Sequence, residues 1–238
     1  MKIDIWSDFA CPFCYIGKRR FEEALEQFAH ADGVRTVFRS FQLDPQASVH
    51  PSGDIHDMLA AKYGMPRAQA KAMNDQVTGQ AAELGLHYDF DRVKPTNTLD
   101  AHRLAHYAAS QGKGDEAAER LLKAYFIDGV NIGEHSVLTA VAEELGLSVE
   151  EVEQVLSSDK YAQDVHQDIE QGVQLGLTGV PFFVFDNKYA VSGAQPSSLF
   201  LEVLNKVWEE NQTVQPLPVI KTNGSAQGGE CTDDSCTI

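Results

Sequence analysis

The pattern of apolar and polar residues divides the chain into strand-forming ends around a long helical middle. Four short segments alternate apolar with polar residues or are rich in aromatic and β-branched residues. They predict strands at residues 2–7, 34–43, 182–185 and 189–191. Between the second and third strands, from about residue 54 to 176, apolar residues recur every three or four positions, which predicts helices. Helical patterns also follow the first strand and cover residues 196–208.

The order of these elements predicts an α/β fold. A strand–helix–strand unit gives parallel neighbours, and the turn at Asp186 and Asn187 makes the last two strands an antiparallel hairpin. Together they predict one mixed four-stranded sheet. The helical block is too long for a connection, so we expect it to pack as an insertion. We predict a sheet domain from residues 1–50 and 177–211, a helical insertion at 51–176, and a flexible tail at 212–238.

Net charge and hydropathy exclude several classes of partner. The 238 residues include 35 Asp and Glu against 19 Lys and Arg, a formal net charge of −16. This balance argues against binding to nucleic acid or to an anionic membrane. No run of about twenty apolar residues occurs, so no membrane-spanning helix is expected. Asp4 and Asp8 interrupt what would be the apolar part of a secretory signal, which favours a cytoplasmic location.

Four cysteines form two close pairs, Cys11 with Cys14 and Cys231 with Cys236. Close pairs in a cytosolic protein indicate redox catalysis or metal binding. Cys11 lies between a strand and the first turn of a helix, where free N–H groups and the helix dipole favour a thiolate. Cys14 follows three residues later on the same helical face. We therefore expect Cys11 to be the exposed entry nucleophile and Cys14 the sheltered resolving thiol.

A metal site is the main alternative interpretation of these cysteines. The two pairs could together bind zinc, although Cys231 and Cys236 are five positions apart in a tail that has little to bury. His102 and His106 have a helical spacing that could also hold a metal, but no H-E-x-x-H pattern is present. We favour redox chemistry over a zinc site and predict no metal and no resident cofactor.

The order of elements and several motifs resemble the thioredoxin-fold DsbA family over about residues 1–210. The likeness is closest to its FrnE-like cytosolic branch, which is related to kappa-class glutathione transferases and 2-hydroxychromene-2-carboxylate isomerases. It rests on Cys11-Pro12-Phe13-Cys14 within residues 7–17, on Asn97-Thr98 with residues 101–104, and on residues 179–183 around Val180-Pro181. It implies a thioredoxin-like sheet with a large all-helical insertion. It also implies that the Val180–Pro181 bond is cis, although the local sequence alone favours trans.

The resemblance suggests roles for residues around the cysteines. Pro181 would face the pair, and the Val180 backbone would offer its N–H and C=O to an extended substrate. Phe13, between the cysteines, can scarcely be buried and would contact apolar substrate groups. Asn97, Thr98 and His102 would line a groove between sheet and insertion. On sequence alone, a helix N-cap followed by a solvated histidine is the simpler interpretation of these three residues.

Asp8 and Trp6 stand just before the first cysteine. Asp8 is either a solvated charge or, if it is buried near the thiol, a group for proton transfer. Trp6 is expected in the core.

We predict a thiol–disulfide oxidoreductase that acts on protein thiols, protein disulfides or glutathione. Cys231 and Cys236 would relay electrons to the active pair, or instead bind a soft metal. One alternative is a glutathione-dependent isomerase or transferase acting on small aromatic substrates, but such relatives usually carry Ser at the position of Cys11. Another alternative is a thiol-based metal-binding or chaperone module.

Overall fold

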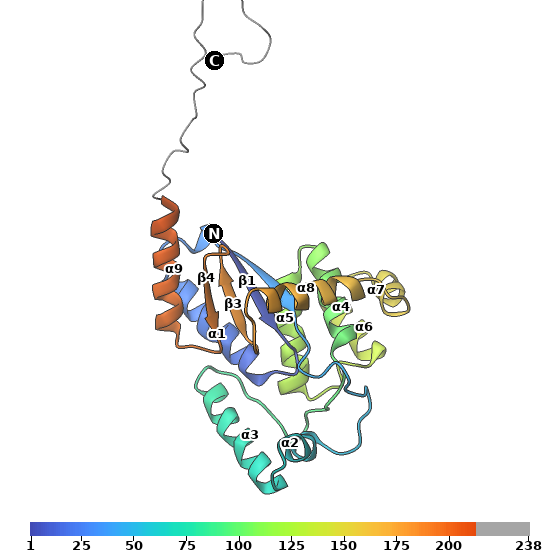
Figure 1. Ribbon diagram of the computed structural model, residues 1–238. Coiled ribbons are helices and arrows are strands. Elements are labelled where there is room, and N and C mark those ends of the chain that lie inside the picture. Colours follow the sequence, from blue (N-terminus) through green and yellow to red (C-terminus); the bar gives the residue numbers. More distant parts are fainter. Residues whose placement is uncertain (213–238) are drawn as a thin grey trace, which may run out of the picture.

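The four predicted strands form one mixed sheet in the computed structural model, which describes residues 1–212. Cys231 and Cys236 lie outside the described residues. The strands are β1 (Lys2–Ser7), β2 (Arg35–Ser40), β3 (Phe182–Phe185) and β4 (Tyr189–Ser192). Their order is β2-β1-β3-β4, with β1 parallel to β2 and the other neighbours antiparallel. The predicted mixed α/β sheet is confirmed (Figure 1).

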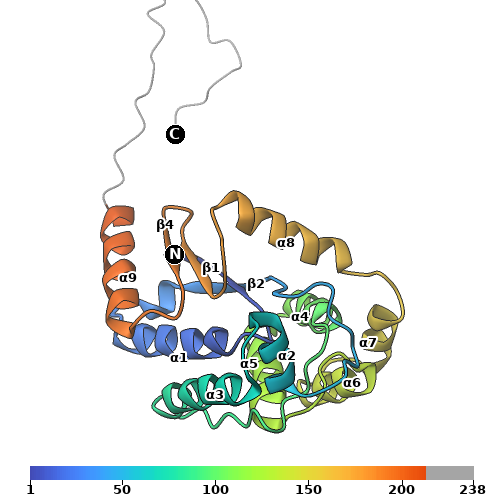
Figure 2. The ribbon, with the colours of Figure 1, turned by 60° about the horizontal axis from the view of Figure 1, so that its bottom comes forward.

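Side chains along β1 point alternately to the two faces of the sheet, and each face carries its own apolar layer. Ile3 and Ile5 pack with Phe183 and Phe185 in a cluster completed by residues of α1 (Pro12–Gln27) and α9 (Ser197–Gln212). Trp6 faces the other way, and its indole N–H donates to the Asp168 carbonyl of α8 (Ala162–Gln174) at 2.6 Å. Figure 2 shows α1 and α9 on one side of the sheet and α8 on the other. Trp6 is fully buried, as the sequence predicted.

Helices fill the long middle of the chain, as expected. They are α2 (Ile55–Tyr63), α3 (Arg67–Ala82), α4 (Leu99–Ser110), α5 (Gly114–Lys123), α6 (His135–Glu144), α7 (Val149–Leu156) and α8. A short 3-10 turn (Ala31–Gly33) precedes β2. Figure 1 shows α4–α8 grouped beside the sheet, while α2 and α3 form a separate pair at the bottom of the view.

The end of the last helix differs from the sequence prediction. The helical pattern at residues 196–208 forms α9, which begins at Ser197 and continues to Gln212. Within the helical middle, α5 ends at Lys123, and the chain continues as a π-helical turn over Ala124–Asp128. The apolar period therefore marks a helix but not its end.

The insertion packs directly on the sheet and on α1. α5 and α8 both contact β2. The buried Lys18 amine of α1 pairs with Glu119 of α5 at 2.9 Å and also with Glu22. The division into domains at residues 50 and 177 stays a prediction. Within the described residues, no helix is long and apolar enough to cross a membrane.

Candidate active site around the paired cysteines

Cys11 occupies the N-cap position of α1. Its backbone is extended, Pro12 takes the first helical position, and its side chain makes no capping hydrogen bond. The Cys11 N–H donates to the Asp8 carbonyl at 3.0 Å, and the Cys11 carbonyl accepts from the Cys14 N–H at 3.0 Å. Pro12 costs nothing here because the first helical N–H has no partner within a helix. The thiol therefore lies at the positive end of the helix dipole, as the sequence predicted.

Both cysteines are free thiols, and both are buried. Cys11 is 4% exposed and Cys14 is 3% exposed. The expectation of an exposed Cys11 was wrong, because segments distant in sequence cover the start of α1. One of them is the loop at Val180, whose carbonyl accepts a hydrogen bond from the Cys11 thiol at 3.5 Å. Cys11 nevertheless lines a groove, so it lies just below the surface.

The peptide bond between Val180 and Pro181 is cis, as the resemblance implied. Pro181 is buried against α1: a Cβ added at Gly17 would lie 2.9 Å from its Cγ. The absence of a side chain at Gly17 thus lets this loop approach the active-site helix. The close packing places the Val180 carbonyl over the Cys11 sulfur.

Burial raises the pKa of the Cys14 thiol well above its ordinary value, and the neighbouring Cys11 adds to the rise. The Ser7 hydroxyl and the Asp8 backbone N–H act in the opposite direction. Cys14 is therefore held as a protonated thiol until something removes its proton. A buried, protonated thiol is what the predicted resolving role of Cys14 requires.

The groove beside Cys11 has a volume of about 320 Å³. It runs from the start of α1 to α2 and α3, so its outer wall is the separate helix pair. Four of the groove residues are apolar side chains that are themselves exposed: Phe13, Leu43, Tyr63 and Met73. Phe13 is 40% exposed, in agreement with its predicted accessibility. The groove thus joins the Cys11 thiol to an apolar, open surface.

Asn97, Thr98 and His102 do not act as one set. Thr98 is buried and lines the groove. Asn97 does not line it; its side chain accepts from the Leu99 N–H at 2.9 Å and donates to the Ala47 carbonyl at 2.9 Å. These bonds fix a loop and satisfy the first N–H of α4, whose N-cap residue is Thr98.

His102 is also absent from the groove. It is 2% exposed, so it is not the solvated histidine that the sequence allowed. Its ring packs on Phe9 with ring centroids 4.6 Å apart, and its Nε2 lies 3.4 Å from the Asp8 carboxylate. The next turn of α4 carries His106, which contacts Ser40 and Asp168 instead. The two histidines therefore face different partners, and residues 1–212 hold no cluster of three metal-binding side chains.

Asp8 is buried, 1% exposed. Its carboxylate accepts from the Leu43 N–H at 2.7 Å and the Ala10 N–H at 3.4 Å, beside His102. The solvated-charge interpretation is thus wrong. The carboxylate ties the loop after β2 to the loop that carries Cys11.

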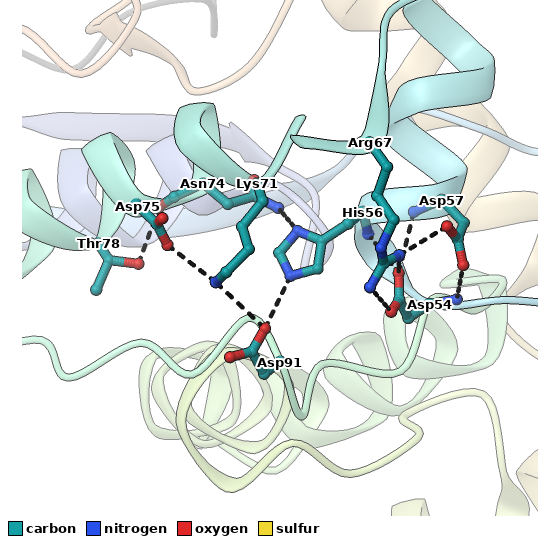
Figure 3. A network of polar contacts seen from close by, with 9 residues as sticks. All are labelled: Asp54, His56, Asp57, Arg67, Lys71, Asn74, Asp75, Thr78 and Asp91. Atoms are coloured by element: carbon teal, nitrogen blue, oxygen red, sulfur yellow. Dashed lines mark hydrogen bonds and ion pairs between the residues drawn. The ribbon is translucent and has the colours of Figure 1, made fainter. Parts of the chain in front are cut away.

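A polar network that the sequence did not reveal holds the outer wall of the groove (Figure 3). His56 of α2 is buried; its Nδ1 is 2.9 Å from the Asn74 amide of α3 and its Nε2 is 3.0 Å from Asp91. At the start of α2, Asp54 forms a reciprocal capping box and pairs with Arg67 of α3. In the sequence, only the D-x-x-D spacing of Asp54 and Asp57 pointed to any part of this network.

Tyr88 is a second functional neighbour that the sequence did not reveal. Its hydroxyl donates to the Pro12 carbonyl at 2.8 Å, and its ring stacks on Phe126 and Tyr15. Burial and the nearby Cys11 raise the pKa of this phenol, so it stays a hydrogen-bond donor at neutral pH. Tyr88 therefore ties the first turn of α1 to the helical insertion.

Comparison with known proteins places this geometry in context. A family described as the DSBA-like thioredoxin domain matches residues 2–205. The crystal structure of a probable DsbA oxidoreductase from Streptomyces coelicolor is 41% identical, with a TM-score of 0.86, and the match covers 96% of this chain and 97% of that one.

Two more distant structures share the fold. A 2-hydroxychromene-2-carboxylate isomerase has a TM-score of 0.69 at 16% identity, over 91% of this chain and 100% of that one. The cytosolic disulfide reductase DsbM from Pseudomonas aeruginosa, solved with glutathione, has a TM-score of 0.60 at 17% identity, over 89% and 98%. The predicted thioredoxin-like DsbA fold is confirmed.

Proposed function

Because this chain belongs to the DSBA-like thioredoxin domain family, we propose that it is a thiol–disulfide oxidoreductase acting by exchange at Cys11 and Cys14. One observation carries the proposal. Two free thiols lie at the start of α1, and the first of them, Cys11, contacts the Val180 carbonyl and lines an apolar groove. Thiol exchange needs this combination of a reachable sulfur and a second sulfur held in reserve.

In the reducing direction, the Cys11 thiolate attacks one sulfur of a substrate disulfide. A Cys11–substrate bond forms, the substrate disulfide breaks, and the first substrate thiolate leaves. Cys14 then loses its proton and attacks the Cys11 sulfur, which releases the second thiolate. Two electrons pass from the protein to the substrate, and the protein is left with a Cys11–Cys14 disulfide. The same steps in reverse oxidise a substrate dithiol.

The groove favours a substrate with apolar groups next to its sulfur. Phe13, Leu43 and Tyr63 present exposed apolar surface beside Cys11. Such a surface suits a cysteine flanked by apolar residues in an extended protein segment, whose backbone could pair with the backbone of Val180. Glutathione is the candidate co-substrate, because it is a thiol peptide and DsbM was solved with it.

A cytoplasmic location fits this activity. Disulfide reduction is the direction that a reducing compartment favours, and DsbM is described as a cytosolic disulfide reductase. Cys231 and Cys236, outside the described residues, would pass electrons between the active pair and an external thiol. A variant lacking both tail cysteines tests this relay: turnover at the parent rate over many cycles would exclude it.

The test of the proposed function is a set of cysteine variants in an insulin-reduction assay with glutathione as the reductant. Cys11→Ser should abolish reduction. Cys14→Ser should accumulate a mixed disulfide at Cys11, detectable as an added mass. Insulin reduction that survives in Cys11→Ser would contradict the proposal. Glutathione-dependent isomerisation of a small aromatic substrate by Cys11→Ser would favour the isomerase class instead.

A further inference from the structure

The second step of the proposed exchange requires a proton acceptor for Cys14, and the inference below rests on that proposed function. Cys14 is 3% exposed, so bulk water does not reach it directly. At this stage the Cys11 sulfur is bonded to substrate and cannot take the proton. Asp8 acts on Cys14 through its backbone N–H, whereas its carboxylate is bound by Leu43, Ala10 and His102.

Among the groups that act on Cys14, the Ser7 side chain remains as an acceptor for its proton. It is the last residue of β1 and lies on the sheet face that carries Ile3 and Ile5, toward α1. It is 4% exposed, and among residues 1–212 its hydroxyl is the one buried side-chain polar atom without a hydrogen-bond partner. This hydroxyl lies close enough to Cys14 to lower the pKa of that thiol against the rise from burial. Apart from this thiol, no group among residues 1–212 partners the hydroxyl, and a buried hydroxyl in that state is rare enough to require an explanation.

A second cavity, of about 260 Å³, begins at Ser7. It lies between β2 and the helices α4 and α5, and its outer lining includes the exposed residues Gly112, Asp115 and Glu116. This volume has room for several water molecules, and the lining offers polar partners for them. The cavity has no lining residue in common with the groove beside Cys11. Substrate in the groove would therefore leave this rear path open.

We propose that the Ser7 hydroxyl and water in this second cavity form the proton-exit route of Cys14. The Ser7 oxygen accepts the proton of the Cys14 thiol while its own proton passes to cavity water, and from there to solvent near Asp115. The electron pair left on the Cys14 sulfur forms the Cys11–Cys14 bond. The Cys11–substrate bond breaks, and its electron pair leaves with the substrate thiolate. The substrate disulfide is the oxidant, so no further reactant is needed.

A neutral hydroxyl suits this position better than a carboxylate would. A second buried charge close to Asp8 would add a desolvation cost and repulsion. The hydroxyl can accept and donate at once, and it returns to its initial state after each transfer. It therefore acts as a relay, and it carries no extra proton between turnovers.

The test uses a chromogenic aromatic disulfide, 5,5′-dithiobis(2-nitrobenzoate), in excess over full-length protein with both tail cysteines changed to Ser. Attack by Cys11 releases one coloured thiolate in a phase whose rate rises with reagent concentration. Resolution by Cys14 releases a second thiolate in a concentration-independent phase. Ser7→Ala should slow the second phase by about tenfold or more, as expected for the loss of general-base assistance. The first phase should stay within about twofold of the parent rate.

Two further variants separate a proton relay from a packing effect. Ser7→Thr keeps the hydroxyl and should restore the second phase. Ser40→Ala is the matched control: Ser40 is buried opposite Ser7 in the sheet register and lines the same cavity, but its hydroxyl contacts His106 and neither sulfur. It should leave the first phase unchanged and slow the second by less than about twofold. In Ser7→Ala the defect should shrink as the pH rises, because hydroxide can take the proton instead.

Some outcomes would overturn the relay alone. They are a second phase in Ser7→Ala within twofold of the parent, or an equal loss in Ser40→Ala. If Ser7→Ala does not fold, the parent decides: its second phase should slow in D₂O and its first should not, and equal rates in both solvents refute the relay. A parent that releases no Cys11-dependent thiolate would instead contradict the proposed function.

Discussion

Replacing Gly17 by Ala should damage the active site more than the fold. Gly17 lies in the second turn of α1, where an added Cβ would stand 2.9 Å from Pro181 Cγ and 3.5 Å from Ala194. Real Cβ atoms avoid contacts below 3.0 Å, and ordinary contact begins at 3.4 Å. The loop at Pro181 would therefore have to move away from α1 by about half an ångström. This movement also displaces Val180, whose carbonyl contacts the Cys11 sulfur.

The magnitudes follow from two opposing terms. Ala is favoured over Gly inside a helix by about 1 kcal/mol. Overpacking a filled site costs about 1–3 kcal/mol. The free energy of unfolding should therefore fall by about 0–2 kcal/mol, a loss that leaves a stable domain folded. A displacement of about 1 Å in a reacting geometry can cost about a hundredfold in rate, so half of that should cost about tenfold.

Gly79→Ala provides the matched control. Gly79 also lies inside a helix, α3, and no atom would come within 4 Å of an added Cβ. This variant should be more stable by up to about 1 kcal/mol and fully active. Urea unfolding and insulin reduction measure both effects in both variants. The packing argument fails if Gly17→Ala keeps parent activity, or if its activity falls only in proportion to the fraction of unfolded protein.

Two further variants probe the contacts that support the site. Burial alone would raise the pKa of Glu119, but hydrogen bonds from Arg19 and Tyr15 and the charge of Lys18 hold it at about 2. The parent should thus keep this stabilisation above pH 4.5 and lose it as the pH falls toward 2. Glu119→Gln should be less stable at pH 7 by about 1–3 kcal/mol, and urea unfolding should no longer show the acid dependence that Glu119 contributes. His56→Ala removes the buried link from α2 to α3 that supports the groove wall. Its KM should rise several-fold, while iodoacetamide should alkylate Cys11 at the parent rate. An unchanged KM would contradict a role for this wall in substrate binding.

The strands could be predicted from the sequence because their signals are local. β1 and β3 begin and end at the predicted residues, and the turn residues Asp186 and Asn187 take positive φ angles of 46° and 54°. Such angles are unusual outside Gly, and Asn and Asp tolerate them best. The position of Cys11 at the start of a helix was equally local, since Pro12 marks the first turn.

Features that depend on distant segments could not be predicted. The burial of Cys11 results from packing by the Val180 loop, which is remote in the sequence. The helical period placed His102 on α4 but did not say that its face of the helix meets Phe9 and Asp8 instead of the groove. The partners of His56 and Tyr88 come likewise from other elements, so their roles were visible only in the structure.

The central claim is that Cys11 and Cys14 alternate between a dithiol and a disulfide. Its most direct test is a redox titration of full-length protein with both tail cysteines changed to Ser, equilibrated in glutathione buffers of graded potential. After acid quench and alkylation, peptide mass analysis measures the fraction of Cys11–Cys14 disulfide. We predict one two-electron transition assigned to this pair. A pair that stays as two free thiols across the whole range of potentials would contradict the account.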